Sequence, residues 1–260
     1  MVRFCANISM LFAEAPFLDR FDLAKAAGFE AVEFQFPYEI PAAEIQIRLL
    51  ATGQELVLFN FPAGNFAAGD RGMATDPDRV DQFQALSEQG LEYASILRPA
   101  KMNCLAGKLL EGVSHEAQRE TLLNNLAWLA DRTAEAGIRL VIEPLNPFDA
   151  PDFFLPTPSS GFNVVADLNH PNLKVEYDIY HAQRTEGNIV ETIAANFAHI
   201  GHIQLADAPD RNEPGTGELN FLFIFAALDR LGYTDRIGLE YRPSTANTVD
   251  SLGWMKEIPQ

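Results

Sequence analysis

Acidic and amide residues stand at the ends of five short apolar runs in this chain. Four of them are Glu143, Asp178, Gln204 and Glu240, and Glu33 ends a fifth run nearer the N-terminus. A short apolar run rich in β-branched residues is typical of a parallel strand that is buried on both faces. The carboxyl ends of such strands meet on one face of a parallel barrel, so we expect these oxygen-bearing side chains to converge.

Three carboxylates and one amide in one place predict a cation site. Without a cation the carboxylates would repel one another, and oxygen-rich ligand sets suit hard divalent ions, magnesium or manganese above all. The alternative is that each acid caps the helix that follows its strand. That alternative is reasonable for one residue, but four such residues on consecutive strands favour the metal site.

A metal held between two glutamates is suited to moving a proton between neighbouring carbons. The cation polarises a carbonyl and an adjacent hydroxyl and lowers the energy of an enediolate. Glu143 and Glu240 could each ligate through one oxygen and act as acid or base through the other. The chain has no G-x-G-x-x-G dinucleotide motif and no phosphate-binding P-loop motif, consistent with isomerisation that needs no redox cofactor.

Two further residues are candidates for substrate contact. His181 lies three residues after Asp178, where its ring could bond a substrate hydroxyl or carbonyl; the alternative is a surface histidine that caps the next helix. Arg211 lies in the segment after the seventh expected strand and could hold a substrate carboxylate or oxyanion with its planar fork. A salt bridge to Asp210 or Glu213 explains Arg211 equally well at this stage.

Other polar residues near the expected strand ends carry weaker signals. His202 shares a strand face with Gln204 and could be a ligand, but a hydrogen-bonded histidine in the barrel interior is the commoner case. Glu33 and Asn7 are expected to line the opposite side of the barrel and support the ligands. Cys104 has no neighbouring base or cation in the sequence, so we interpret it as a packing residue.

The elements that must position these residues follow a helix–glycine–strand repeat. Glycines 28, 53, 137 and 232 each follow a helical pattern and precede a strand-like run, as expected for left-handed helix ends. Repeated units of this kind predict right-handed crossovers and a parallel sheet. The expected strands are 3–7, 31–36, 55–60, 101–105, 139–143, 173–178, 200–205 and 237–241. The expected helices are 17–27, 41–52, 78–97, 115–136, 160–169, 187–198, 220–231 and 247–256.

Eight strands that alternate with eight helices predict an α/β fold, a (β/α)8 TIM barrel, as a single domain over residues 1–260. The segments after strands are the long ones, at residues 61–77, 144–159 and 206–219. Long segments at the carboxyl ends of the strands are where a barrel builds its active site.

Composition excludes several classes of partner. The chain has 260 residues and a formal net charge of −17, which disfavours nucleic acid and anionic membrane surfaces. The apolar stretches are strand-sized, and we expect neither a membrane span nor a signal peptide. Only two cysteines are present, so reduced thiols in a cytoplasmic protein are expected. The outer helices could carry a homo-oligomer interface, but nothing in the sequence selects one.

Motifs along nearly the whole chain resemble those of the hydroxypyruvate isomerase family, within the xylose isomerase-like TIM barrels. No single motif is specific, but together they are. They are Phe4 to Phe12, Gly28 to Phe34 with Phe36 to Tyr38, Phe59-Asn60, Ala67 to Gly72, Leu105 to Gly107, Glu143 to Asn146, Asp178 to His181, Gln204 to Arg211, Gly217 to Asn220 and Gly238 to Tyr241.

The resemblance implies that hydroxypyruvate and tartronate semialdehyde are interconverted through an enediol. It implies metal ligands at Glu143, Asp178, Gln204 and Glu240, an acid–base pair at Glu143 and Glu240, and substrate contacts at His181 and Arg211. One departure bears on specificity, because Asn103 stands where some relatives carry histidine.

Several alternatives to this function remain at this stage. Members of the family that the chain resembles also act on 2-oxo-tetronates and related sugar acids, and ketose 3-epimerisation would use the same two glutamates. A metal-dependent phosphoesterase or endonuclease would need a histidine-rich multi-zinc site and a basic groove. Five histidines and a net charge of −17 disfavour this class. A non-catalytic binding protein is disfavoured by the two intact glutamates.

Overall fold

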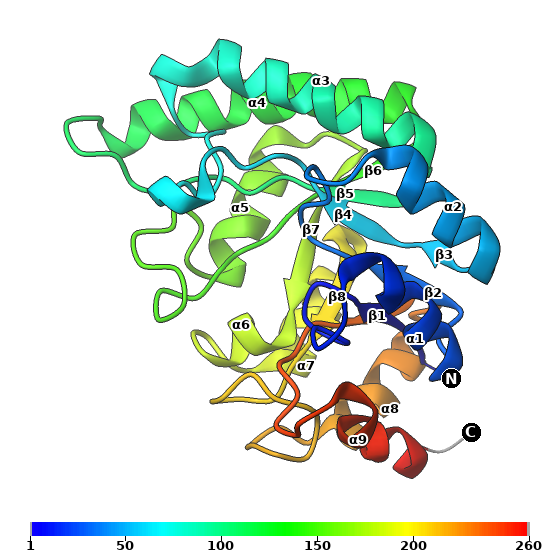
Figure 1. Ribbon diagram of the computed structural model, residues 1–260. Helices are drawn as coiled ribbons and strands as arrows, with labels where there is room; N and C mark the ends of the chain where they lie inside the picture. The colour runs from blue at the N-terminus through cyan, green and yellow to red at the C-terminus, as the bar shows by residue number, and fades with distance from the viewer. Residues whose placement is uncertain (1, 259–260) are drawn as a thin grey trace.

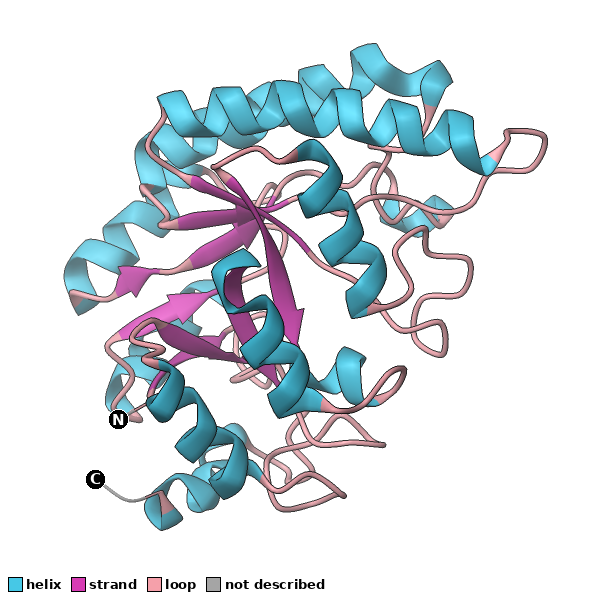
Figure 2. Ribbon diagram, turned by 180° about the vertical axis from the view of Figure 1, so that it is seen from behind, coloured by secondary structure: helices cyan, strands magenta, loops and turns pink. Residues whose placement is uncertain are grey.

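The computed structural model describes residues 2–258, and these form a parallel β-barrel surrounded by helices (Figures 1 and 2). The sheet order is β3-β2-β1-β9-β8-β7-β6-β5-β4, and every neighbouring pair is parallel. The strands are β1 (Arg3–Asn7), β2 (Ala31–Glu33), β3 (Glu55–Leu56), β4 (Leu58–Asn60), β5 (Lys101–Asn103), β6 (Arg139–Ile142), β7 (Leu173–Asp178), β8 (Ile200–Leu205) and β9 (Arg236–Leu239).

The strands β3 and β4 together make one position of the barrel. Only Val57 separates them, and its N–H donates to the Val32 carbonyl at 2.9 Å while its own carbonyl accepts from the Lys101 N–H at 3.0 Å. The chain from residue 55 to residue 60 is therefore hydrogen-bonded to the β2 segment on one side and to the β5 segment on the other. The result is a closed barrel of eight strand positions, which confirms the predicted (β/α)8 fold.

Helices connect successive strands on the outside of the barrel (Figure 2). Gly53 and Gly232 end two of them with φ angles of 65° and 77°, a left-handed conformation that side chains with a Cβ rarely adopt. The helices are α1 (Arg20–Ala26), α2 (Ala42–Thr52), α3 (Val80–Leu97), α4 (His115–Glu135), α5 (Pro158–Leu168), α6 (Ile179–Gln183), α7 (Ile189–Asn196), α8 (Phe221–Leu231) and α9 (Thr248–Ser251).

The structure departs from the predicted elements in three places. The expected strand 31–36 ends as a regular strand at Glu33, and the expected helix 247–256 is a short α9 followed by a 3-10 helix, Leu252–Glu257. The helix α6 was not predicted. It begins directly at the end of β7, because the Asp178 carboxylate accepts from the Tyr180 N–H at 2.8 Å and caps it without any connecting residues.

The barrel interior is closely packed below the strand ends. Cys5, Ala31 and Val141, which share a strand face with the site residues, are fully buried there. Among the described residues, no helix combines the length and apolar character that a membrane crossing requires. The core thus holds the strand ends rigidly, and the side chains beyond it form the site described next.

Candidate active site

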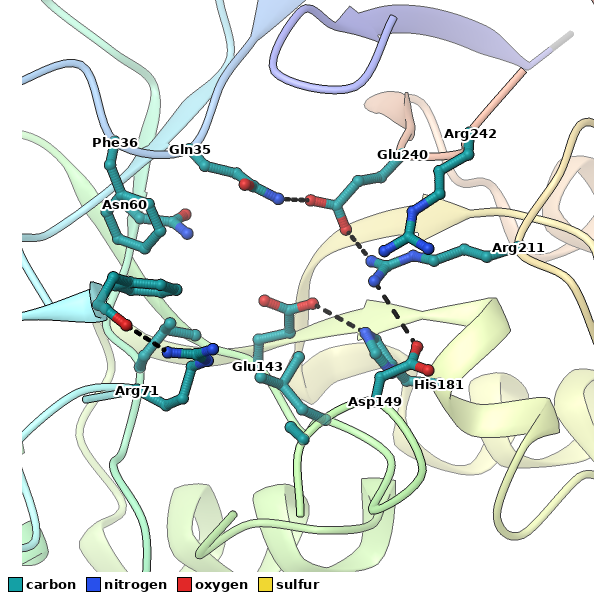
Figure 3. Close-up of a pocket in the computed structure, with 14 residues that line it drawn as sticks. Gln35, Phe36, Asn60, Arg71, Glu143, Asp149, His181, Arg211, Glu240 and Arg242 are labelled. Atoms are coloured by element: carbon teal, nitrogen blue, oxygen red, sulfur yellow. Dashed lines mark hydrogen bonds and ion pairs between the residues drawn. The ribbon is translucent and has the colours of Figure 1, made fainter. Parts of the chain in front are cut away.

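The four residues predicted as metal ligands lie together at the carboxyl ends of neighbouring strands. Asp178 and Gln204 belong to β7 and β8, while Glu143 and Glu240 come directly after β6 and β9. All four side chains are buried, with between 2% and 6% of their surface exposed. Glu143 and Glu240 face a common cavity of about 260 Å³, a size that suits a small molecule (Figure 3).

Burial and mutual repulsion make the three carboxylates hard to ionise together. Burial raises the pKa of Glu143 well above its usual range, and the charges of Glu240 and Asp178 add to the shift. Burial is also the main reason why the pKa of Asp178 rises to about 7 and that of Glu240 rises. A bound divalent cation would favour the ionised form of all three groups.

Gln204 is oriented so that its carbonyl oxygen is available as a ligand. Its Nε2 donates to Glu33 Oε1 at 2.7 Å, which leaves Oε1 of Gln204 buried and without a hydrogen-bond partner in the described part of the chain. A buried unpaired oxygen is costly unless something binds it. Together with three crowded carboxylates, this oxygen fits a divalent cation.

Glu143 and Glu240 are each held by amide donors from other strands. Asn103 Nδ2 donates to Glu143 Oε2 at 3.0 Å, and both Gln35 Nε2, at 2.8 Å, and Asn7 Nδ2, at 3.2 Å, donate to Glu240 Oε1. Gln35 was not predicted as a site residue, although its position two residues after Glu33 was a signal. Asn7 was expected on the opposite side of the barrel, but β1 pairs directly with β9 and so brings it to Glu240.

His181 is buried in α6 and not at the surface, so the alternative of a surface capping residue was wrong. The Asn146 N–H donates to Nδ1 at 3.1 Å, and therefore the hydrogen of the neutral ring lies on Nε2. Burial and the nearby Arg211 charge lower the pKa of His181 well below its usual range and keep it neutral.

The hydrogen on Nε2 of His181 points into the site without a partner. Nε2 is 3.5 Å from Asp178 Oδ2 and 3.8 Å from Glu143 Oε1, too far for hydrogen bonds, and is buried. A metal could be placed among these three residues by distance alone. The protonated Nε2 instead suits a donor to a substrate oxygen, because a metal ligand needs a bare nitrogen.

Arg211 lies among the carboxylates and pairs with neither Asp210 nor Glu213. Its Nη2 is 2.7 Å from Glu240 Oε2 and 3.5 Å from Asp178 Oδ2, and its Nη1 is 3.8 Å from Asp149. The guanidinium therefore compensates part of the negative charge of the cluster. It also lies 5.1 Å from the centre of the Tyr180 ring.

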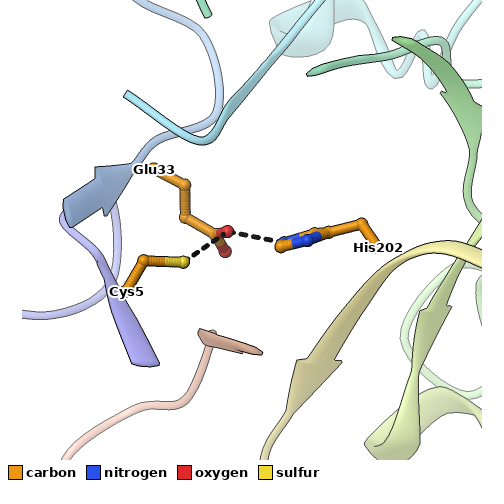
Figure 4. A group of neighbouring side chains, drawn as sticks. All are labelled: Cys5, Glu33 and His202. Atoms are coloured by element: carbon orange, nitrogen blue, oxygen red, sulfur yellow. Dashed lines mark hydrogen bonds and ion pairs between the residues drawn. The ribbon is translucent and has the colours of Figure 1, made fainter. Parts of the chain in front are cut away.

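Cys5, Glu33 and His202 form a second buried cluster deeper in the barrel (Figure 4). Glu33 Oε2 accepts from Cys5 Sγ at 3.2 Å and is 2.7 Å from His202 Nε2, while Lys101 Nζ is 3.3 Å from His202 Nδ1. The oxygens of Glu33 are thus already occupied by protein donors. His202 is a hydrogen-bonded interior residue, the commoner of its two interpretations, and Glu33 supports Gln204.

Cys104 is buried, and burial raises its pKa to about 12, which makes it unsuitable as a nucleophile. Both cysteines are unpaired. The packing interpretation of Cys104 therefore agrees with its surroundings.

Residues 21–258 match the family model described as "Xylose isomerase-like TIM barrel". The chain belongs to this family. It is 43% identical to the 2-oxo-tetronate isomerase of Cupriavidus necator and 42% identical to the hydroxypyruvate isomerase of Escherichia coli, over 98% of each chain in both cases. The chain is thus an isomerase enzyme.

A solved structure from Brucella melitensis has the same fold over its whole length. It is titled AP endonuclease, family 2, and shares 38% identity with this chain at a TM-score of 0.96, with 100% of each chain covered. That title describes the Brucella protein.

Proposed function

We propose that the protein interconverts hydroxypyruvate and tartronate semialdehyde by proton transfer through an enediol. A carboxylate removes the proton on C3, and the electron pair of that C–H bond forms the C2–C3 double bond as the C2 carbonyl becomes an enediol oxygen. Return of a proton to C2 and transfer of the O3 hydroxyl proton to O2 complete the aldehyde. The observation that carries this proposal is that the Glu143 and Glu240 side chains both point into one cavity.

The acid–base roles are assigned to Glu143 and Glu240. Each has one oxygen that accepts from an amide, Asn103 for Glu143 and Gln35 for Glu240. This arrangement holds each carboxylate and leaves its second oxygen toward the cavity, where proton transfer is needed. In Glu240 that second oxygen contacts Arg211, whose charge opposes the rise in the pKa of Glu240 that burial causes.

His181 and Arg211 are assigned to substrate oxygens. The unpaired Nε2 hydrogen of His181 can donate to the carbonyl or hydroxyl oxygen as negative charge develops there. Arg211 can stabilise the same charge, since its Nε is also buried without a hydrogen-bond partner in the described residues.

Glu143, Asp178, Gln204 and Glu240 would hold a divalent cation, with magnesium or manganese favoured by the all-oxygen donor set. When bound, the cation would polarise the carbonyl and adjacent hydroxyl oxygens and stabilise the enediolate. The unpaired Gln204 Oε1 supports this assignment.

The second candidate is isomerisation of a 2-oxo-tetronate, the reaction named for the Cupriavidus necator relative. A 2-oxo-tetronate has the same carboxylate, C2 carbonyl and C3 hydroxyl as hydroxypyruvate and adds a hydroxymethyl group on C3. The same two glutamates could move its C3 proton to C2. Ketose 3-epimerisation would use them on opposite faces of one carbon.

The direct test is incubation of the metal-loaded protein with hydroxypyruvate in deuterated water, followed by proton NMR. We expect tartronate semialdehyde that carries deuterium on C2. Glu143→Gln and Glu240→Gln should each lower the rate by ~10²–10⁴-fold while circular dichroism shows an intact fold. Glu44→Gln removes one exposed carboxylate from α2 and serves as the control.

Failure to convert hydroxypyruvate, with conversion of a 2-oxo-tetronate, would select the second candidate. Normal turnover in either glutamine variant would remove that glutamate from the acid–base pair. Full activity after complete metal removal would exclude the assignment of a cation.

A further inference from the structure

Arg71 lies across the cavity from Arg211 and Glu240 and has no role in the chemistry described so far (Figure 3). It comes from the long segment after β4, within the motif Asp70-Arg71-Gly72. Glu143 lies between the two sides of the cavity. A substrate that reacts at the glutamates can therefore extend toward Arg71.

The segment that carries Arg71 is held in a defined conformation. The Asp70 carboxylate forms a two-pronged ion pair with Arg79, at 3.0 and 2.8 Å, and also accepts from the Asn65 N–H at 2.8 Å. A Cβ on Gly72 would overlap the Leu105 carbonyl oxygen, so the segment lies directly against the chain after β5. The backbone of Arg71 is fixed on both sides by these contacts.

The guanidinium of Arg71 is itself positioned but keeps unused donors. Its Nη1 donates to the Asp70 carbonyl at 2.6 Å and the Phe66 carbonyl at 3.3 Å, and the group lies 4.4 Å from the centre of the Phe66 ring. Within residues 2–258, Nη2 and Nε of Arg71 have no hydrogen-bond acceptor. These two nitrogens are the pair that can bind one carboxylate with two parallel bonds.

Arg71 also differs from Arg211 in its charge environment. Arg211 has three carboxylates within 4.0 Å, whereas no carboxylate of the described residues forms an ion pair with Arg71; the nearby Asp70 carboxylate is paired with Arg79 and acts on Arg71 only through its charge. In a chain with a net charge of −17, an arginine without such a partner beside a cavity favours an anionic ligand. The carboxylate cluster around Glu143 and Glu240 would repel the same anion, so the substrate has only one favourable orientation.

We propose that Arg71 binds the substrate carboxylate through Nε and Nη2 and thereby sets the preference for sugar acids over neutral sugars. The inference rests on the proposed isomerisation for its substrate, since hydroxypyruvate and 2-oxo-tetronates share a carboxylate next to C2. It assigns the carboxylate to Arg71 and not to Arg211, which was a candidate from the sequence. Arg211 remains assigned to the substrate oxygens on the reacting carbons.

Binding and turnover test this proposal separately. Tartronate is a three-carbon acid that cannot isomerise, and glycerol is a neutral probe of the same length. We expect calorimetry to show tartronate binding to the wild-type protein, weakened by about 10–100-fold in Arg71→Gln and less in Arg71→Lys. Arg48→Gln removes one positive charge from the surface of α2 and should leave tartronate binding unchanged.

Kinetics should show the same discrimination. Dihydroxyacetone has the geometry of hydroxypyruvate with a hydroxymethyl group in place of the carboxylate. We expect Arg71→Gln to raise KM for hydroxypyruvate by about 10–100-fold and to leave turnover of dihydroxyacetone, where it is measurable, unchanged. The ratio of kcat/KM for the acid over the neutral sugar should fall accordingly.

Three results would overturn the proposal. The first is an unchanged affinity for tartronate in a folded Arg71→Gln protein. The second is an equal loss of kcat/KM for acid and neutral substrates in this variant. The third is loss of the preference for acids in Arg242→Gln alone; Arg242 is an exposed arginine that also lines the cavity. If the wild-type protein isomerises no acid but binds tartronate through Arg71, the proposed reaction fails and the carboxylate site stands.

Discussion

At the scale of single residues, the orientation of one amide decides whether the site can hold a cation. Glu33 is fully buried and accepts from Gln204, Asn7 and Cys5, with His202 also within 2.7 Å. Because its carboxylate can only accept, the amide nitrogen of Gln204 must face Glu33, and the oxygen must face the site. Groups that orient a ligand in this way usually contribute strongly to metal affinity.

Glu33→Gln is expected to weaken binding of manganese by ~10–100-fold, because the new amide allows Gln204 to turn over. Calorimetric titration of the metal-free protein measures this directly. Glu30→Gln, an exposed change just before β2, is the control. Unchanged metal affinity in a folded Glu33→Gln protein would mean that Gln204 is held by other contacts or is not a ligand.

The raised pKa of Asp178 predicts that the metal-free protein loses stability toward unfolding as the pH rises. The folded-state pKa is about 7, against a usual value of 3.8, so the folded protein retains this proton where the unfolded chain loses it. The resulting stabilisation is complete below the unfolded value and is lost as pH rises through about 7.

Relative to Asp178→Asn, which cannot ionise, the wild-type protein should therefore lose stability between about pH 4 and pH 8. Urea unfolding in the presence of a chelator, at several pH values in this range, measures the difference. Parallel pH profiles for the two proteins would show that Asp178 ionises normally in the folded state.

At the scale of elements, the segment after β8 places Arg211 through one buried aspartate. The Asp207 carboxylate accepts from the N–H groups of Gly215, Gly217 and Leu219, at 2.9, 2.9 and 3.1 Å. The Asp207 carboxylate thus holds residues 215–219 against the end of β8. Arg211 adopts a positive φ of 60° within it, a conformation that the surrounding contacts must maintain.

Asp207→Ala should release this segment. We expect a loss of about 3 kcal/mol or more in the free energy of unfolding, since hydrogen bonds to a buried charge are lost, together with a higher KM. Denaturant unfolding and steady-state kinetics measure the two effects. Asp210→Ala changes an exposed acid of the same segment and should leave both nearly unchanged; equal effects from the two variants would argue against the closing role of Asp207.

At the scale of the whole molecule, the proposed metal site concentrates negative charge in a protein that is already strongly acidic. A cation that binds only the folded state stabilises it by about 2.7 kcal/mol at a concentration 100 times its dissociation constant. For a chain of this size, such a gain corresponds to a rise in Tm of about 5–10 °C.

Thermal unfolding with manganese and with chelator measures this rise. Potassium chloride at matched ionic strength is the control for general screening of the net charge of −17. The rise should be absent in Glu143→Gln combined with Asp178→Asn. A rise that persists in this double variant would place the cation elsewhere on the molecule.

The barrel could be predicted from the sequence because its signals are local. Apolar runs, glycines at helix ends and acids at strand ends all lie within a few residues of one another, and parallel strands bring their carboxyl ends to one face wherever they pair. Glu143, Asp178, Gln204 and Glu240 could thus be selected as neighbours before any contact was known. Their roles as ligands and as acid and base stay predictions.

Only the tertiary structure decided how these side chains are oriented and charged. Asn7 and Gln35 reach Glu240 across more than 200 positions of sequence, and Asn146 sets the tautomer of His181 from another strand end. Arg211 and Arg71 look alike in sequence, as single arginines in long segments. Three carboxylates lie within 4.0 Å of Arg211, whereas none in residues 2–258 forms an ion pair with Arg71. This difference arises from contacts between distant segments, which a sequence pattern does not contain.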